Sequence, residues 1–322
     1  MDKLKRICLN EIEGVRIGHA QDEMHGTGCT VIICEERAIC GVDVRGGGPA
    51  SRETQLLNPL MSNDGVNAIL LSGGSAYGLD AASGVMRYLE ARGQGVRVGD
   101  AVVPIVVGSC IFDLNCASGN IRPDGDMGYL ACADSERNIE RCGNVGAGTG
   151  ATVGKLMGNA HAMKSGVGSY AVQVGELKVG AIVVVNAIGD VYEMDSQRPL
   201  AGLLSEDGSH IISSESMLMG MFAAMPPMAA NTTIAAIITN AALDKAGANK
   251  AAAMASNGIA RTIRPVNTSM DGDSVYALSC GKVNAPCDVV GVLGAHVLAK
   301  AVNRAVTEVK SKYGFKASCD IQ

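Results

Sequence analysis

The chain has 322 residues, of which 47% are hydrophobic and 18% are charged, and its net charge is −5. This length and apolar content are enough to bury a large core, in one big domain or two smaller ones. The sequence has no basic stripe that could neutralise phosphates, and aromatic residues make up only 3% of it, with no tryptophan. Nucleic acid is therefore not an expected partner.

The N-terminal segment, MDKLKRICLNEIEG, is polar and lacks the apolar stretch of a signal peptide. The most apolar segments, 101–112 and 180–189, are too short to cross a bilayer. We therefore expect a soluble, cytoplasmic protein with no membrane partner.

Short segments rich in valine and isoleucine predict strands at 29–34, 38–44, 68–72, 170–174, 179–185, 233–239 and 274–279. Helical spacing of apolar residues predicts helices at 77–91, 241–257 and 288–310. His296 lies on the apolar face of the last helix, where we expect a packed core histidine. The polar segment 205–216 predicts a surface loop. Because the elements follow no strict βαβ rhythm, we expect a layered α/β fold with at least one largely antiparallel sheet.

The eleven cysteines are an odd number, so at least one of them is free. The pairs at 29/34, 110/116 and 280/287 do not have the close CxxC spacing that is typical of zinc sites. We interpret the cysteines as small buried residues of a reducing compartment, and we expect neither a metal nor an organic cofactor.

Two glycine-rich segments superficially suggest common motifs. The segment GAGTGATVGK does not match a phosphate-binding loop, because Thr149 stands where the loop requires its first glycine and Leu156 stands where it requires Ser or Thr. It does not match the dinucleotide-binding motif G-x-G-x-x-G either, because Ala151 occupies the position of the last glycine. Ser75 is not within a G-x-S-x-G elbow, and the five histidines offer no obvious partner for a Ser-His-Asp triad. Both nucleotide binding and serine-triad chemistry are therefore disfavoured.

The segment Asn231-Thr232-Thr233 opens an apolar strand. A threonine hydroxyl is a weak nucleophile unless a base lies beside it. If the chain is cut before Thr232, its own α-amine becomes that base, because an α-amine has a pKa of about 7.7–8.0. Taken alone, the tripeptide is also typical of an ordinary turn at a strand start.

Asp271-Gly272-Asp273 precedes another apolar strand. Carboxylates two residues apart on an extended segment point the same way, and such a pair can hold a free ammonium group. An ordinary acidic turn is the alternative. The loop predicted at 205–216 would give the chain slack upstream of Thr232.

The sequence contains six notable segments, which are in chain order RGGGPASRETQLL, LSGGSAYGLDAASGV, VGAGTGATVGK, VVVNAIGDV, NTTIA and GIARTIRPVNTSMDGD. Together they resemble the L-aminopeptidase/D-amidase-esterase (DmpA-like) family of self-processing hydrolases. This family includes β-aminopeptidases and a nylon-oligomer hydrolase, and the resemblance runs from near Gly14 to about Gly294. It implies an αββα sandwich related to N-terminal-nucleophile hydrolases but with different strand connectivity, as in ornithine acetyltransferases.

The resemblance also implies that a single domain, 1–322, is cut between Asn231 and Thr232 into an α chain, 1–231, and a β chain, 232–322. The fragments stay together, and the processed units form a homo-oligomer, for which a tetramer is one option. The implied activity removes N-terminal residues from small peptides, amides or esters, including substrates with D- or β-amino acids.

The resemblance assigns roles to five residues. Thr232 corresponds to the nucleophile, and Asn186 to the side-chain amide that binds the oxyanion. Lys155 corresponds to a basic residue near the nucleophile. Asp271 and Asp273 correspond to the pair that contacts the nucleophile and its amine.

One position departs from the family pattern. Phe112 stands where well-studied members place a tyrosine whose hydroxyl assists at the oxyanion, and phenylalanine has no donor. Two other functions stay open: ornithine acetyltransferase-like acyl transfer, and an uncleaved, non-enzymatic small-molecule-binding descendant. The methionine-rich segment 217–228 is interpreted as packing rather than as part of the site or of an oligomer interface.

Overall fold

The computed structural model describes residues 4–221 and 231–321. Its strands are β1 (Lys5–Ile7), β2 (Val15–Asp22), β3 (Thr27–Val44), β4 (Ala50–Arg52), β5 (Val66–Ser72), β6 (Val96–Val98), β7 (Ala101–Val103), β8 (Val106–Cys110), β9 (Thr152–Val153), β10 (Met163–Lys164), β11 (Val167–Val174), β12 (Leu177–Asn186), β13 (Asp190–Tyr192), β14 (Pro199–Ala201), β15 (Leu203–Leu204), β16 (Ile211–Ile212), β17 (Thr232–Ala241), β18 (Ile263–Arg264) and β19 (Ser274–Val283). Its α-helices are α1 (Ala81–Glu90), α2 (Gly125–Asp134), α3 (Ser214–Gly220), α4 (Lys245–Ala255), α5 (Asn257–Ala260) and α6 (Cys287–Thr307).

The long strand β3 joins two layers of sheet. Its first part pairs with β2 and β5, and its second part, Ile39 to Val44, pairs with β19. The strand order is β1-β11-β12-β17-β19-β3-β5-β8-β4, with β2 branching from β3. The pairing register of β3 with β5 shifts between Ile33 and Ala38, which lets one strand serve both layers.

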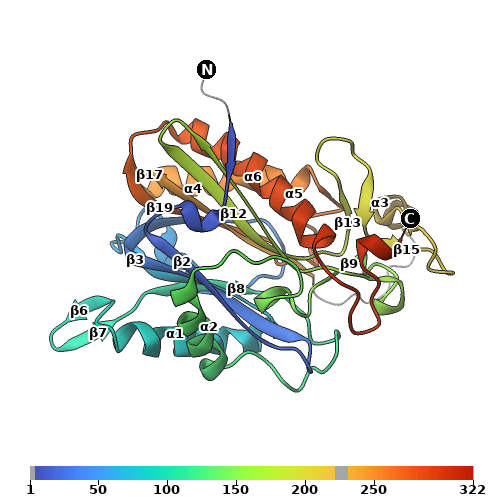
Figure 1. The fold of residues 1–322 in the computed structure, drawn as a ribbon, viewed down its shortest axis with the longest axis horizontal. Coiled ribbons are helices and arrows are strands. Elements are labelled where there is room, and N and C mark those ends of the chain that lie inside the picture. Colours follow the sequence, from blue (N-terminus) through green and yellow to red (C-terminus); the bar gives the residue numbers. More distant parts are fainter. Residues whose placement is uncertain (1–3, 222–230, 322) are drawn as a thin grey trace.

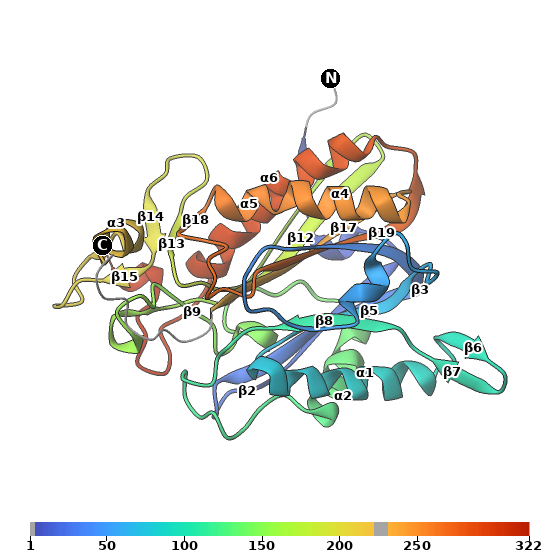
Figure 2. The same cartoon turned by 180° about the vertical axis from the view of Figure 1, so that it is seen from behind.

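Helices cover the outer face of each layer (Figures 1 and 2). Helices α4 and α6 pack on β3, β19, β11 and β12, whereas α1 and α2 pack on β5 and β2. Between the layers, Ile32 and Leu71 of one sheet share an apolar core with Ile182 and Ile234 of the other. The expected αββα sandwich is thus confirmed.

All seven predicted strands are present, and segments 29–34 and 38–44 are parts of one strand, β3. The predicted helix 241–257 begins too early, because β17 continues to Ala241 and the helix starts at Lys245. Asp244 sets this start, since its side chain accepts the Gly247 N–H at 2.7 Å and so caps the helix. The predicted helix 77–91 opens with a 3₁₀ segment, Ser75–Asp80.

Helix α6 is apolar and, at 21 residues, long enough to cross a membrane by length and composition. Most of it is buried against β11 and β12, so we interpret it as a core helix. His296 is half-buried on α6, where its ring packs edge-on against Tyr170. The predicted loop 205–216 is partly structured, because it contains β16 and the start of α3.

Candidate active site

Asn186 and Thr232 are register partners on the antiparallel strands β12 and β17. On its other side β17 runs parallel to β19, so Thr232 begins a strand that is flanked by neighbours on both sides. Thr232 and Asn186 are both buried. A strand that is paired on both sides opens less readily than an edge strand, and this pairing holds the backbone of Thr232 in place.

The Asn231–Thr232 peptide is held by the segment before β19. The Asn231 N–H donates to the carbonyl of Met270 at 3.1 Å, and the Gly272 N–H donates to the carbonyl of Asn231 at 2.8 Å. The Thr232 hydroxyl donates to the same Asn231 carbonyl. The hydroxyl therefore lies directly against the peptide bond at the predicted cleavage site.

Both aspartates are buried next to this peptide. Asp273 accepts the N–H of Thr233 at 2.6 Å and the N–H of Asn267 at 3.0 Å. Asp271 accepts the N–H of Thr268 at 2.8 Å and its hydroxyl at 2.6 Å. The predicted pair is thus beside Thr232, and its orientation is fixed by hydrogen bonds.

Burial and, second to it, the negative charge of Asp271 raise the pKa of Asp273 to about 7. Burial also raises the pKa of Asp271, against the lowering effect of its hydrogen bonds with Thr268. Asp273 can therefore take up or release a proton near neutral pH.

The glycine-rich segment 45–48 packs against the aspartate pair. The Gly48 N–H donates to the Asp271 carbonyl at 2.9 Å, and the Gly46 N–H donates to the Asp273 carbonyl at 3.2 Å. A Cβ atom on Gly46 would lie 2.3 Å from the Asp273 nitrogen. The glycines of this motif thus permit a close backbone approach that supports the acidic segment.

The side-chain amide of Asn186 is held on both sides. Its Nδ2 donates to the carbonyl of Phe112 at 3.0 Å, and its Oδ1 accepts the N–H of Thr152 at 3.1 Å. Lys155 donates from Nζ to the backbone carbonyl of Asn186 at 2.9 Å. Phe112 cannot supply a hydroxyl, but its backbone anchors the amide.

Lys155 is a buried basic residue of the site. Burial lowers its pKa to about 7, while the negative charges of Asp271 and Asp113 act in the opposite direction. It lies on a small pocket that also includes Phe112, Asp113 and Cys116. At neutral pH, Lys155 is therefore balanced between its charged and neutral forms.

Asp113 and Lys164 belong to the same region and are missed by the sequence analysis. Buried Asp113 accepts the Gly74 N–H at 2.6 Å and the Thr27 hydroxyl at 2.7 Å, and burial raises its pKa to about 6. Buried Lys164 donates to the carbonyl of Ala151 at 2.8 Å, and burial lowers its pKa to about 8. These groups fix the loops that carry Phe112 and Lys155.

Residues far apart in the sequence form this site, so spacing alone does not identify Asp113 or Lys164. The Thr268–Asp271 contact has a local sequence pattern, because the spacing is that of a capping box, in which a side chain three residues later accepts the backbone N–H of a serine or threonine. Among the described residues, no cluster of three or more His, Cys, Asp or Glu side chains is arranged to hold a metal ion.

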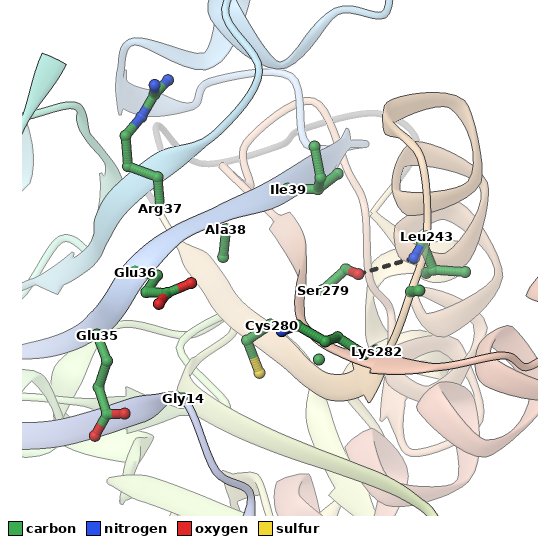
Figure 3. Close-up of a pocket in the computed structure, with 12 residues that line it drawn as sticks. Gly14, Glu35, Glu36, Arg37, Ala38, Ile39, Leu243, Ser279, Cys280 and Lys282 are labelled. Atoms are coloured by element: carbon green, nitrogen blue, oxygen red, sulfur yellow. Dashed lines mark hydrogen bonds between the residues drawn. The ribbon is translucent and has the colours of Figure 1, made fainter.

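A separate surface cavity of about 350 Å³ is lined by Glu36, Cys280 and Lys282 among others (Figure 3). It lies at the far ends of β17 and β19, which is about 30 Å from Thr232 along the strand. This cavity is therefore not part of the candidate active site.

Three solved structures have the same fold. An L-aminopeptidase/D-Ala-esterase/amidase from Ochrobactrum anthropi, described as a variant of the Ntn hydrolase fold, has a TM-score of 0.71 at 18% identity and covers 96% of this chain and 90% of its own. A Burkholderia β-aminopeptidase has a TM-score of 0.68 at 16% identity and covers 98% and 92%. The PH0078 protein of Pyrococcus horikoshii has a TM-score of 0.69 at 19% identity and covers 99% and 92%. The architecture is therefore a variant Ntn-hydrolase fold.

The family model of Peptidase family S58 matches residues 8–317, and the chain belongs to this family. An uncharacterized aminopeptidase of Mycobacterium leprae is 38% identical over 97% of this chain and 93% of its own length. A 6-aminohexanoate-oligomer endohydrolase of Paenarthrobacter ureafaciens is 29% identical over 86% of this chain and 76% of its own. The protein is thus a hydrolase of the aminopeptidase and amidase type, which favours hydrolysis over acyl transfer and over a non-enzymatic role.

Proposed function

We propose that the chain cuts itself between Asn231 and Thr232 and then uses Thr232 as an N-terminal nucleophile against small peptides, amides or esters. The contact of the Thr232 hydroxyl with the Asn231 carbonyl supports this proposal most directly. Two ionisable groups near this peptide, Asp273 and Lys155, support it further, because each has a pKa of about 7.

In the self-cleavage, the Thr232 oxygen adds to the Asn231 carbonyl carbon. The C–N bond between Asn231 and Thr232 then breaks, and the departing nitrogen takes up the proton that the hydroxyl has lost. Lys155 and Asp273 relay this proton, because each has a pKa of about 7. Water hydrolyses the resulting ester, which frees the Asn231 carboxylate and the Thr232 hydroxyl.

In the mature enzyme, the α-amine of Thr232 accepts the proton of its own hydroxyl. The hydroxyl oxygen attacks the substrate carbonyl, and the leaving amine takes the proton. Asn186 stabilises the oxyanion through the second hydrogen of Nδ2, since the first is bonded to Phe112. Water then releases the acyl group, and no metal or organic cofactor takes part.

We propose substrates with a free N-terminus, with D- or β-amino acids among the residues accepted. Relatives described as aminopeptidases and as a 6-aminohexanoate-oligomer endohydrolase support an amide substrate. Dipeptides, amino-acid amides and 6-aminohexanoate oligomers are therefore the first compounds to assay.

We further propose that the processed α and β fragments remain associated and assemble into a homo-oligomer. The fragment association is supported by the sheet order, in which β17 and β19 of the β chain lie between β12 and β3 of the α chain. The β6–β7 hairpin, which projects from the body, supports assembly because it exposes Val98 and Val103 (Figure 1). Light scattering of the purified protein measures the assembly size.

Intact-mass analysis of freshly made protein tests the self-cleavage. We expect two fragments, 1–231 and 232–322, from the natural sequence and one uncut chain from Thr232→Ala. Thr233→Ala is the matched control, because it removes the adjacent buried hydroxyl and leaves Thr232 in place. Hydrolysis of the substrates named above should follow the cut fraction.

An uncut natural chain that nevertheless hydrolyses these amides would refute the N-terminal nucleophile. So would normal cleavage in Thr232→Ala. Equal loss of cleavage in Thr233→Ala and Thr232→Ala would point to a distorted strand instead of a lost nucleophile.

A further inference from the structure

Gly272 contacts the atom that becomes negatively charged in the proposed self-cleavage. Its N–H donates to the Asn231 carbonyl oxygen at 2.8 Å, on the peptide that the Thr232 hydroxyl also contacts. Donors that stabilise an oxyanion lie about 2.7–3.1 Å from it. The Gly272 N–H therefore already contacts the oxygen on which the charge develops, and a backbone N–H is the donor type of many oxyanion-binding sites.

The contacts of Asn186 in the uncut chain are with groups other than the Asn231 carbonyl. One hydrogen of its Nδ2 goes to the Phe112 carbonyl, and its Oδ1 is bonded to Thr152. On the Asn231 carbonyl, the structure places a backbone N–H from the acidic segment before β19, beside the hydroxyl of Thr232 itself. Self-cleavage thus has a backbone donor already in contact with its carbonyl oxygen, in addition to the second Nδ2 hydrogen of Asn186 that is proposed for substrate hydrolysis.

The surroundings hold the Gly272 N–H in this orientation. Asn231 and Asp271 form a parallel bridge, and the Gly48 N–H ties the Asp271 carbonyl at 2.9 Å. Glycine is needed here, since a Cβ on Gly272 would lie 2.8 Å from the Thr232 hydroxyl oxygen and 2.9 Å from the Gly48 carbonyl. The donor is therefore fixed before the reaction begins, which is the condition for effective electrostatic stabilisation.

We infer that the backbone N–H of Gly272 is the oxyanion donor of the self-cleavage step. This inference rests on the proposed function. As the Thr232 oxygen bonds to the Asn231 carbon, the electron pair of the C=O double bond moves to the carbonyl oxygen, where the Gly272 N–H stabilises it. When the C–N bond breaks, the double bond re-forms and the nitrogen of Thr232 takes up the proton.

The test replaces the Gly272 N–H by an ester oxygen, with glycolic acid incorporated at position 272 of the full chain by in vitro translation. This change removes the donor and adds no side-chain atom. The same replacement at Gly48 is the matched control, since it removes one N–H from the same region without touching the Asn231 carbonyl. Intact mass over time gives the cleavage rate and separates it from hydrolysis of the introduced ester.

We expect the ester at position 272 to slow cleavage about 10²–10³-fold, and the ester at position 48 to slow it less than tenfold. If the chain that carries the ester at position 272 cuts itself before Thr232 at a rate within tenfold of the natural chain, the inference is overturned while self-cleavage itself stands. Absence of cleavage in the natural chain would instead overturn the proposed function.

If the position-272 ester does not fold, hydrogen exchange in the uncut Thr232→Ala chain decides the question. Slow exchange of the Gly272 amide, with the Gly48 amide as reference, is the expected result. Exchange of the Gly272 amide at the rate of an unprotected peptide would show that the donor is not on the Asn231 carbonyl, and would overturn the inference.

Discussion

Asn186 and Thr232 face each other as the last and first residues of adjacent strands, β12 and β17. The backbone pairing of these strands therefore sets the position of the amide relative to the hydroxyl. Because the backbone pairing of the sheet maintains this geometry, a substitution at either residue can remove the reactive side chain and leave the fold intact. Activity and folding stability can then be measured separately.

Replacement of Asn186 by alanine should lower kcat for amide hydrolysis about 10²–10³-fold, because an oxyanion donor is removed. Steady-state kinetics on an amino-acid amide measures this change. Asn240→Ala is a suitable control, since Asn240 also bonds backbone groups on both sides, to Lys178 and Glu176, but at the far end of β17. An equal fall in kcat in both variants would contradict a catalytic role for Asn186.

Phe112→Tyr should raise kcat/KM up to about tenfold, because it adds a hydroxyl donor at the position where well-studied members of the family have a tyrosine. The backbone carbonyl of Phe112 that anchors Asn186 is unaffected by this change. Paired assays of the two proteins, with melting temperatures as a check on folding, measure the effect. An unchanged kcat/KM would mean that the new hydroxyl does not reach the oxyanion.

The rate of self-cleavage should rise with pH and level off above about pH 7. Asp273 and Lys155 each have a pKa of about 7, and below that pH both are protonated and cannot accept the hydroxyl proton. Intact-mass time courses from pH 5 to pH 9 measure the profile, and Asp273→Asn and Lys155→Met show which group sets the midpoint. A rate that falls or stays constant over this range would contradict the assignment.

His19 should make the fold less stable as the pH falls from 6.5 to 4. Burial lowers the pKa of His19 to about 4, with the charge of Arg141 acting in the same direction and that of Asp134 opposing it. The folded form therefore disfavours the protonated ring. The contribution of neutral His19 to the free energy of unfolding is present above pH 6.5 and is lost as the pH falls through 4. The shift corresponds to at most about 3 kcal/mol.

Urea unfolding of the uncut Thr232→Ala chain at several pH values checks this prediction. In a His19→Gln version of the same chain, the loss of unfolding free energy between pH 6.5 and pH 4 should be smaller by up to that amount. Parallel pH dependence of the two chains would show that His19 does not contribute.

The sequence predicts the strands well because valine and isoleucine runs mark strands that are buried on both faces. It does not predict that 29–34 and 38–44 form one strand, since that depends on which partners each half finds. The early start predicted for α4 has a similar cause. Ala241 fits a helix by propensity, but its pairing with Val283 keeps it in β17.

The candidate site likewise combines residues that can be predicted from the sequence with features that depend on the folded structure. Thr232, Asn186, Lys155 and the two aspartates can be predicted from the resemblance to a family, and the fold brings them together. The role that we propose for Gly272 depends on a backbone N–H, which every residue except proline carries, so no sequence pattern reveals it. The segment 217–228, which the sequence analysis interprets as packing, is described only to Met221. In that part Met217 and Met221 pack against a small core, whereas Met219 is exposed. Residues 222–228 lie outside the described residues.

The sheet order has a consequence for how a cut molecule unfolds. Once the bond before Thr232 is broken, the two central strands β17 and β19 belong to a different chain from the strands on either side of them, β12 and β3. Separation of the two fragments then requires the sheet to open, so global unfolding becomes a dissociation. Its midpoint should depend on protein concentration, and refolding should become a second-order encounter of two chains, whereas within each protomer the uncut precursor needs only a first-order collapse.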